Sequence, residues 1–105
     1  MATGLPIITT YYSAQTEYLN QIQSSCYFVD FNLVDIDCPL YQSCYPTPDG
    51  NYGQWAKPNV DSIIEGMLEV YRKYDYYDYR AKDAEFITKS TFSWVKSAEN
   101  AIKIL

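Results

Sequence analysis

The chain has 105 residues and a mass of 12.2 kDa, which is enough for one small domain or for part of one. Apolar residues at 48% and charged residues at 20% argue against a disordered chain, and no apolar run is long enough to span a bilayer. All of the negative excess behind the net charge of -5 lies in residues 1–56, which contain five acidic residues and no Lys or Arg. A surface without a base does not attract phosphate, so we expect no nucleic-acid partner.

The cysteine and histidine content limits the possible chemistry. Three cysteines, Cys26, Cys38 and Cys44, cannot all pair within one chain, so we expect reduced thiols. Histidine is absent, and a structural zinc site would need all three thiols and a carboxylate, so we expect neither a metal nor a bound cofactor. Ser-His and Cys-His nucleophiles are excluded for the same reason, and any catalysis would have to use carboxylates, tyrosines or lysines.

The N-terminal stretch MATGLPIITT lacks the features of a secretory signal. It has no basic region ahead of an apolar segment and no small-residue cleavage pattern. We therefore expect a cytoplasmic location.

The first third of the chain predicts a strand, a helix and a second strand. Residues 5–10 (LPIITT) are short, apolar and β-branched, as buried parallel strands are. Ser13 is a suitable N-cap for a helix over 14–22, and residues 26–31 (CYFVDF) are dense in aromatic and β-branched residues. A strand, helix and strand at this spacing indicate a parallel α/β unit.

The rest of the chain predicts a long loop followed by helices. Residues 32–58 are rich in proline and glycine and show no sustained period, which predicts a loop that Trp55 anchors in the core. Asn59 is a good N-cap for a helix ending near Tyr74, a second helix is expected over 77–89, and Ser93 caps a third. In the first helix, the apolar residues that recur at helical spacing are Ile63, Ile64, Met67, Leu68 and Tyr71. The last helix is expected to bury Trp94, Val95, Ala98, Ala101, Ile102 and Leu105.

Two other patterns in the helical half have competing interpretations. The tyrosines between Tyr71 and Tyr79 alternate with Arg72, Lys73 and Arg80, as in a strip that stacks single-stranded nucleic acid, but the acids among them neutralise it and favour packing. Glu65 and Glu69 are four residues apart, as paired acid-base carboxylates can be, but the neighbouring Arg72 and Lys73 favour a solvated helix face.

Four ordered motifs resemble a known family. Residues 1–10 (MATGLPIITT) and 12–19 (YSAQTEYL) resemble the MACGLPVI and YSGPTEFL passages of retaining family-4 glycosyltransferases of the GT-B fold. Residues 53–60 (GQWAKPNV) are similar to the GxWAEPDV segment, and residues 92–94 (FSW) to the signature that opens the last helix. The resemblance implies an α/β fold, the C-terminal part of a doubly wound, Rossmann-like donor-binding domain: two short parallel strands followed by a helical second half, with residues 1–105 as a single partial domain.

The resemblance also implies a function. A member of this family transfers a sugar from a nucleotide sugar to an acceptor with retention at the anomeric carbon. The Glu-x7-Glu motif that holds the donor would lie upstream of Met1, so we expect no catalytic residue in this chain and no transfer by the chain alone. The nucleotide-sugar donor would be a partner only in the context of a full enzyme.

The same resemblance places Ser13, Thr16 and Glu17 in a substrate-binding turn on the donor side of the cleft. Ala14 stands where the family has glycine, which costs roughly 1 kcal/mol if a positive φ is needed there. The alternative interpretation is that Ser13 caps a helix and Glu17 stabilises its first turn.

The partial domain leaves a sheet edge without a neighbouring strand. We therefore expect self-association or a complementary glycosyltransferase chain as the partner. The alternative function is that of a non-catalytic protein-interaction module or a truncated gene product.

Overall fold

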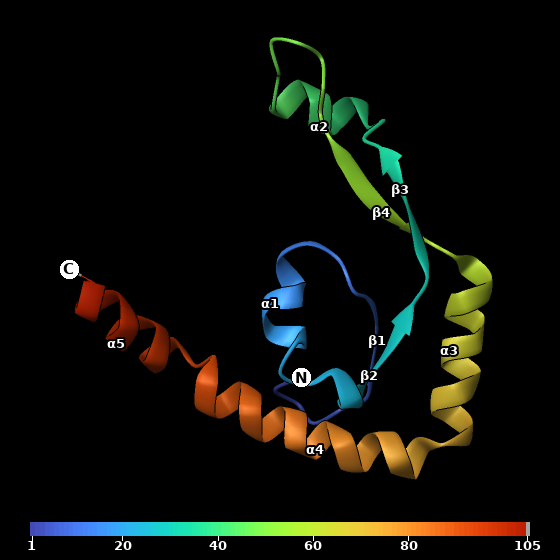
Figure 1. Cartoon of the computed structure of the whole chain (residues 1–105), viewed down its shortest axis with the longest axis vertical. Helices are drawn as coiled ribbons and strands as arrows, with labels where there is room; N and C mark the ends of the chain where they lie inside the picture. The colour runs from blue at the N-terminus through green and yellow to red at the C-terminus, as the bar shows by residue number, and fades with distance from the viewer. Residues whose placement is uncertain (105) are drawn as a thin grey trace.

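The two predicted parallel strands are present and lie side by side (Figure 1). The computed structural model describes residues 1–104, so the expected burial of Leu105 lies outside the described residues. Strand β1 is Ile7–Thr10 and strand β2 is Cys26–Val29, with Ile7 opposite Cys26 in parallel register. The chain is thus a mixed α/β structure with two short parallel strands and a helical second half, as predicted.

The connection between β1 and β2 is a series of short turns instead of the predicted helix over 14–22. It contains the 3-10 turn η1 (Ser13–Gln15), the single helical turn α1 (Thr16–Leu19) and the 3-10 turn η2 (Gln23–Ser25). Ser13 has a φ of 63°, whereas an N-cap residue normally has extended backbone angles, so the predicted Ser13 cap is wrong. The N-cap position of α1 is Gln15, and its side chain makes no capping hydrogen bond.

Helices cover both faces of the β1–β2 pair. One face carries Ile7, Cys26 and Phe28, which pack with Leu19 and Ile22 from the connection and with Ala84 from the second half of the chain. The other face carries Ile8 and Tyr27, which lie against Gly66. This alternation follows from the period of two along a strand and creates the small apolar core between the connection and the helices.

The predicted loop over 32–58 is wrong, because its two ends form the strands of an antiparallel ribbon and part of its middle is helical. Strands β3 (Phe31–Asp35) and β4 (Gln54–Pro58) pair with Val34 opposite Trp55, and the helix α2 (Pro39–Cys44) lies in the segment that joins them. The predicted strand over 26–31 is also interrupted, since β2 ends at Val29 and β3 begins at Phe31. Pro39 does not prevent α2, because proline fits the first turn of a helix, where its missing N–H is not needed.

Three helices form the second half: α3 (Val60–Arg72), α4 (Tyr74–Thr91) and α5 (Trp94–Ile104). The predicted cap of α3 is confirmed, since Asn59 Oδ1 accepts hydrogen bonds from the N–H groups of Asp61 at 2.8 Å and Ser62 at 3.2 Å. The cap at Ser93 is also confirmed, with Ser93 Oγ accepting from the Lys96 N–H at 3.2 Å. Helix α4 is longer at both ends than the predicted 77–89, and none of the described helices is long and apolar enough to cross a membrane.

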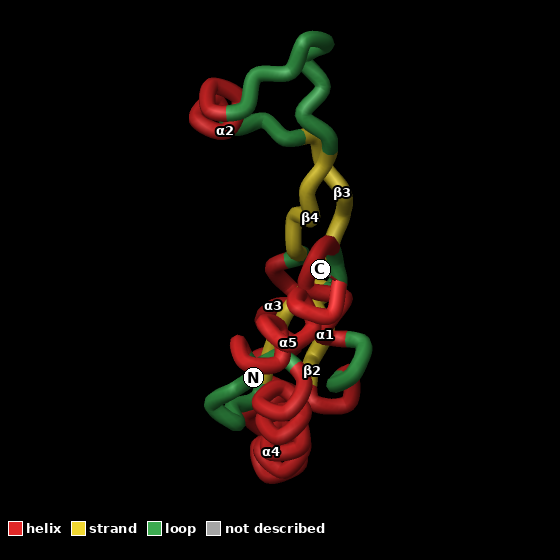
Figure 2. The backbone as a smooth tube through the Cα atoms, turned by 90° about the vertical axis from the view of Figure 1, so that its left-hand side faces the viewer, coloured by secondary structure: helices red, strands yellow, loops and turns green. Residues whose placement is uncertain are grey.

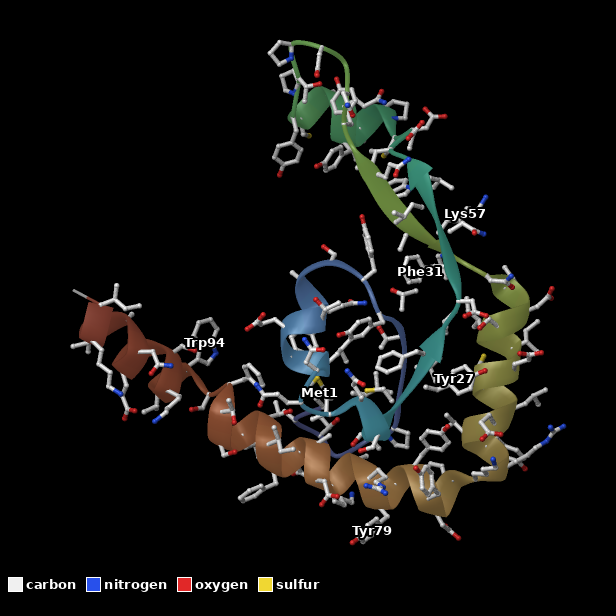
Figure 3. All side chains as sticks on the ribbon, in the orientation of Figure 1. Met1, Tyr27, Phe31, Lys57, Tyr79 and Trp94 are labelled. Atoms are coloured by element: carbon white, nitrogen blue, oxygen red, sulfur yellow. The ribbon has the colours of Figure 1, made fainter. Side chains whose placement is uncertain are left out.

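The predicted burial of the last helix is wrong. Trp94 is 92% exposed and projects from the start of α5, and no residue of α5 that the structure describes is buried (Figure 3). Trp55, expected to anchor the core, is 42% exposed on the ribbon. Both predictions were made from residue type and local pattern. These show that a side chain is apolar, but not whether the rest of the chain can cover it.

The described part of the chain has an open shape. Its radius of gyration is 17.3 Å, well above the roughly 13 Å expected for a compact chain of this length. The ribbon extends from one side of the helical body, which is thin when viewed from the side (Figure 2). Helix α5 extends away at the far end of α4 (Figure 1).

Candidate functional site

The sequence-predicted substrate residues Ser13, Thr16 and Glu17 all lie in the connection that leaves the carboxyl end of β1. In parallel α/β sheets, ligands bind outside the carboxyl ends of the strands, so the position suits a ligand-binding loop. Ser13 is the one non-glycine residue with a positive φ among residues 1–104. A left-handed conformation at serine is uncommon, and it falls on Ser13 and not on Ala14, so alanine at position 14 carries no cost of this kind.

The loop is held by its neighbours on both sides. The Gln15 side-chain amide donates to the Thr10 carbonyl and to Thr10 Oγ1, which ties the turn to the end of β1. The Tyr12 hydroxyl donates to the Gln54 carbonyl at 3.1 Å, and its ring lies 5.4 Å from the Phe31 ring. Tyr12 therefore joins the loop to both strands of the ribbon.

The three predicted residues do not converge on one point. Thr16 Oγ1 donates to the Ser13 carbonyl at 2.8 Å, so this hydroxyl stabilises the turn itself. The side chains of Ser13 and Glu17 are exposed. The nearest base along the chain is Lys57, which lies on the opposite side of the ribbon from Phe31 (Figure 3). The loop itself contains no basic side chain, so it offers a phosphate group only backbone N–H groups and the exposed Ser13 hydroxyl.

A shallow hollow of about 340 Å³ lies beside the same strand ends. Its lining residues, which come from β1, β2, β4 and α3, are Ile8, Thr9, Thr10, Val29, Pro58, Ile63 and Met67. No lining residue is titratable, so the hollow offers apolar contact and two hydroxyl groups but no general acid or base.

The other chemical candidates have structural roles. Glu69 forms an ion pair with Lys73 at 2.7 Å, and Glu65 is exposed, which favours a solvated helix face for these two residues. Tyr77 is buried, and the Arg80 guanidinium lies 5.6 Å from the centre of the Tyr76 ring, so these residues of the tyrosine strip pack within the chain. Within residues 1–104 no cluster of three His, Cys, Asp or Glu side chains could hold a metal ion.

Cys26 is the one cysteine that is buried in the described chain. Burial in the apolar core raises the pKa of its thiol from 9.0 to about 11. A raised pKa disfavours the thiolate, which is the nucleophilic form, so Cys26 is an inert core residue.

The Cys26 thiol is expected to make the fold less stable in alkali. Because its folded pKa is higher than its unfolded pKa, its contribution to stability is fully present below pH 9 and is lost as the pH rises towards 11. Raising the pH from about 8 to about 10 should cost about 1 kcal/mol through this group. Urea unfolding of the wild type and of Cys26→Ala at both values measures the effect, and the variant should lose less stability than the wild type. Equal losses would contradict the burial of this thiol.

The sequence did not predict which face of α3 packs on the sheet. The buried residues are Ser62 and Gly66, and a Cβ atom added to Gly66 would lie 2.6 Å from the Tyr27 ring. Small residues four positions apart allow this close approach, and that pair was the signal available in the sequence. Among the larger apolar residues of α3, Ile63 and Val70 are half-buried, whereas Val60, Ile64, Met67, Leu68 and Tyr71 are exposed.

The comparisons with known proteins give no assignment. No family model matches the chain, and no curated protein and no solved structure matches it significantly. The glycosyltransferase resemblance therefore remains a prediction that rests on the four ordered motifs.

Proposed function

We propose that this chain is the closing segment of the donor-binding domain of a retaining glycosyltransferase, and that it contributes structure and not catalytic groups. The resemblance of residues 1–10, 12–19, 53–60 and 92–94 supports the family. The parallel β1–β2 pair with helices on both faces supports a doubly wound domain, although many unrelated enzymes share that arrangement.

The observation that carries the proposal is the incomplete sheet. β1 and β2 pair only with each other in the described chain, so each has an outer edge without a partner strand. Parallel sheets are stable when several strands are paired and covered on both faces, and a two-stranded parallel sheet offers little hydrogen bonding of its own. A complementary chain that adds parallel strands to this sheet would complete a donor domain.

The role of the loop follows from its chemistry. Ser13 and the residues after it would face the donor across the cleft, with backbone N–H groups directed at its phosphates. Helix and turn N-termini without a basic side chain give weak attraction, so the chain alone should bind a nucleotide sugar only at millimolar concentration. It should transfer no sugar, because the loop offers no basic side chain to stabilise a departing nucleoside diphosphate.

A donor titration tests this proposal. The isotope-labelled chain is titrated with UDP-glucose and GDP-mannose, with uridine and guanosine as controls, and backbone amide shifts are followed by NMR. We expect millimolar binding with the largest shifts at residues 11–17, and smaller shifts with the nucleosides. If the amide shifts of residues 11–17 do not change, or if they change equally with the nucleosides, the loop does not have a donor role. Micromolar affinity that Glu17→Ala abolishes would contradict a purely structural role.

A non-catalytic interaction module is the second candidate. It is favoured by the large apolar side chains that α3 and α5 expose, among them Tyr71 at 81% and Trp94 at 92%. If the donor titration produces no amide shift changes while the chain associates measurably with itself or with another protein, this candidate is favoured over the first.

A further inference from the structure

Helix α3 carries an apolar stripe that the chain does not cover. We call it the α3 stripe; its members are Val60, Ile64, Met67, Leu68 and Tyr71, each at least 43% exposed. It lies on a different side of the helix from Ser62 and Gly66, which face β2. Because the small residues fix that inward side, most of the α3 stripe is directed away from the sheet, and only Met67, at its edge, also lines the hollow beside β1 and β2.

Helix α5 carries a second uncovered stripe. The α5 stripe consists of Trp94, Val95, Ala98, Ala101 and Ile102, which recur at helical spacing and are all exposed. The side chains in the middle of this stripe are small and those at its ends are large, since the two alanines lie between Trp94 and Ile102. The α3 stripe has large side chains along its middle, so the two surfaces complement each other in shape.

The two stripes cannot meet within one chain. Helix α4 joins the end of α3 to the start of α5, and its 18 residues span about 27 Å. The helices therefore lie at opposite ends of α4 (Figure 1). Helix α5, with 11 residues or about 16 Å, is too short to return along α4 and reach the outer side of α3.

The two helices also carry net charges of opposite sign. Helix α3 contains three acidic residues, Asp61, Glu65 and Glu69, against one base, Arg72. Helix α5 contains two bases, Lys96 and Lys103, against one acid, Glu99. Opposite net charges favour contact between α3 and α5 over contact between two copies of α3.

We propose that the α5 stripe of one chain docks on the α3 stripe of a second copy, and that the contact is reciprocal. Each large apolar side chain offers on the order of 100 Å² or more, so two such helix pairs would together bury on the order of 1,600 Å². That is the size of a standard stable interface, whereas a single helix pair would fall short of it. The dimer uses neither the donor loop nor the outer edges of the sheet, so it goes beyond the glycosyltransferase proposal.

Sedimentation velocity of the full chain under reducing conditions tests the dimer. The variants are Tyr71→Lys in the α3 stripe and Ile102→Lys in the α5 stripe, with Phe86→Lys as the matched control, because Phe86 is 74% exposed and lies on α4 outside both stripes. We expect a wild-type dimer, dissociation constants raised roughly tenfold or more in the two stripe variants, and no change in the control, because a lysine desolvated without a partner opposes docking. Unchanged circular dichroism verifies that the helices persist.

Mixing the two stripe variants makes the test specific. A mixed pair contains one intact contact, between α5 of the Tyr71→Lys chain and α3 of the Ile102→Lys chain, whereas neither variant alone can form any. The mixture should therefore associate more tightly than either variant by itself. A monomeric wild type, or a mixture no tighter than its components, would overturn the proposal, as would equal weakening by Phe86→Lys.

Discussion

Replacing Leu19 by alanine is expected to lower the free energy of unfolding by about 2–5 kcal/mol, the range for truncating a buried leucine. Leu19 is 1% exposed and packs with Ile22, Cys26 and Ala84. These residues join the β1–β2 connection to the sheet and to α4, so the cavity would open where three parts of the chain meet. A loss of this size is a large fraction of the stability of a small domain.

Urea unfolding followed by circular dichroism at fixed protein concentration measures this effect. Leu40→Ala is the matched control, because Leu40 lies on α2 and is 74% exposed. The control should change the free energy of unfolding by no more than about 0.5 kcal/mol. Equal losses in the two variants would mean that the core does not lie around Leu19.

Replacing Gly66 by leucine is expected to destabilise the fold by about 3 kcal/mol through overpacking. A Cβ atom at this position would lie 2.6 Å from the Tyr27 ring and 3.3 Å from Ile8 Cγ2, so α3 would have to move away from the sheet. Leucine is a better helix former than glycine by nearly 1 kcal/mol, and the steric cost must exceed that gain.

The matched control for this prediction is Glu65→Leu, at an exposed neighbouring position of the same helix. It introduces the same side chain without a clash, so its free energy of unfolding should stay close to that of the wild type. Thermal unfolding of both variants makes the comparison. A Gly66→Leu variant as stable as Glu65→Leu would show that α3 does not pack closely on β2.

Local signals in the sequence were sufficient for part of this fold. The parallel strands and the caps at Asn59 and Ser93 were predicted, because each depends on residue types within a few positions. The ribbon was not, because its two strands lie about 20 residues apart and pair through backbone groups that carry no sequence signal. The exposure of Trp94 depends on which other surfaces the chain can bring near it, and local periodicity does not contain that information.

The candidate loop likewise combines features that the local sequence predicts with features that it does not. Its location at the carboxyl end of β1 follows from the strand pattern, and Ser13, Thr16 and Glu17 do lie there. The left-handed backbone at Ser13 was not predictable, because serine is a usual capping residue and rarely adopts a positive φ. The tether from Tyr12 to Gln54 depends on the ribbon, so it was missed together with the ribbon.

The ribbon is also an insertion whose two ends lie close together, at the end of β2 and the start of α3. The Asn59 N–H donates to the Asp30 carbonyl at 2.8 Å, and the Asp30 N–H donates to Ser62 Oγ at 3.0 Å, so the end of β2 and the start of α3 are joined directly. Residues 31–58 lie wholly between these joined ends, and the entropic cost of closing such a segment grows only slowly with its length. The part of the segment between the two strands, residues 37–52, can therefore lengthen, shorten or accept inserted sequence without changing how α3 sits on the sheet, which makes it the part of this segment most open to evolutionary variation.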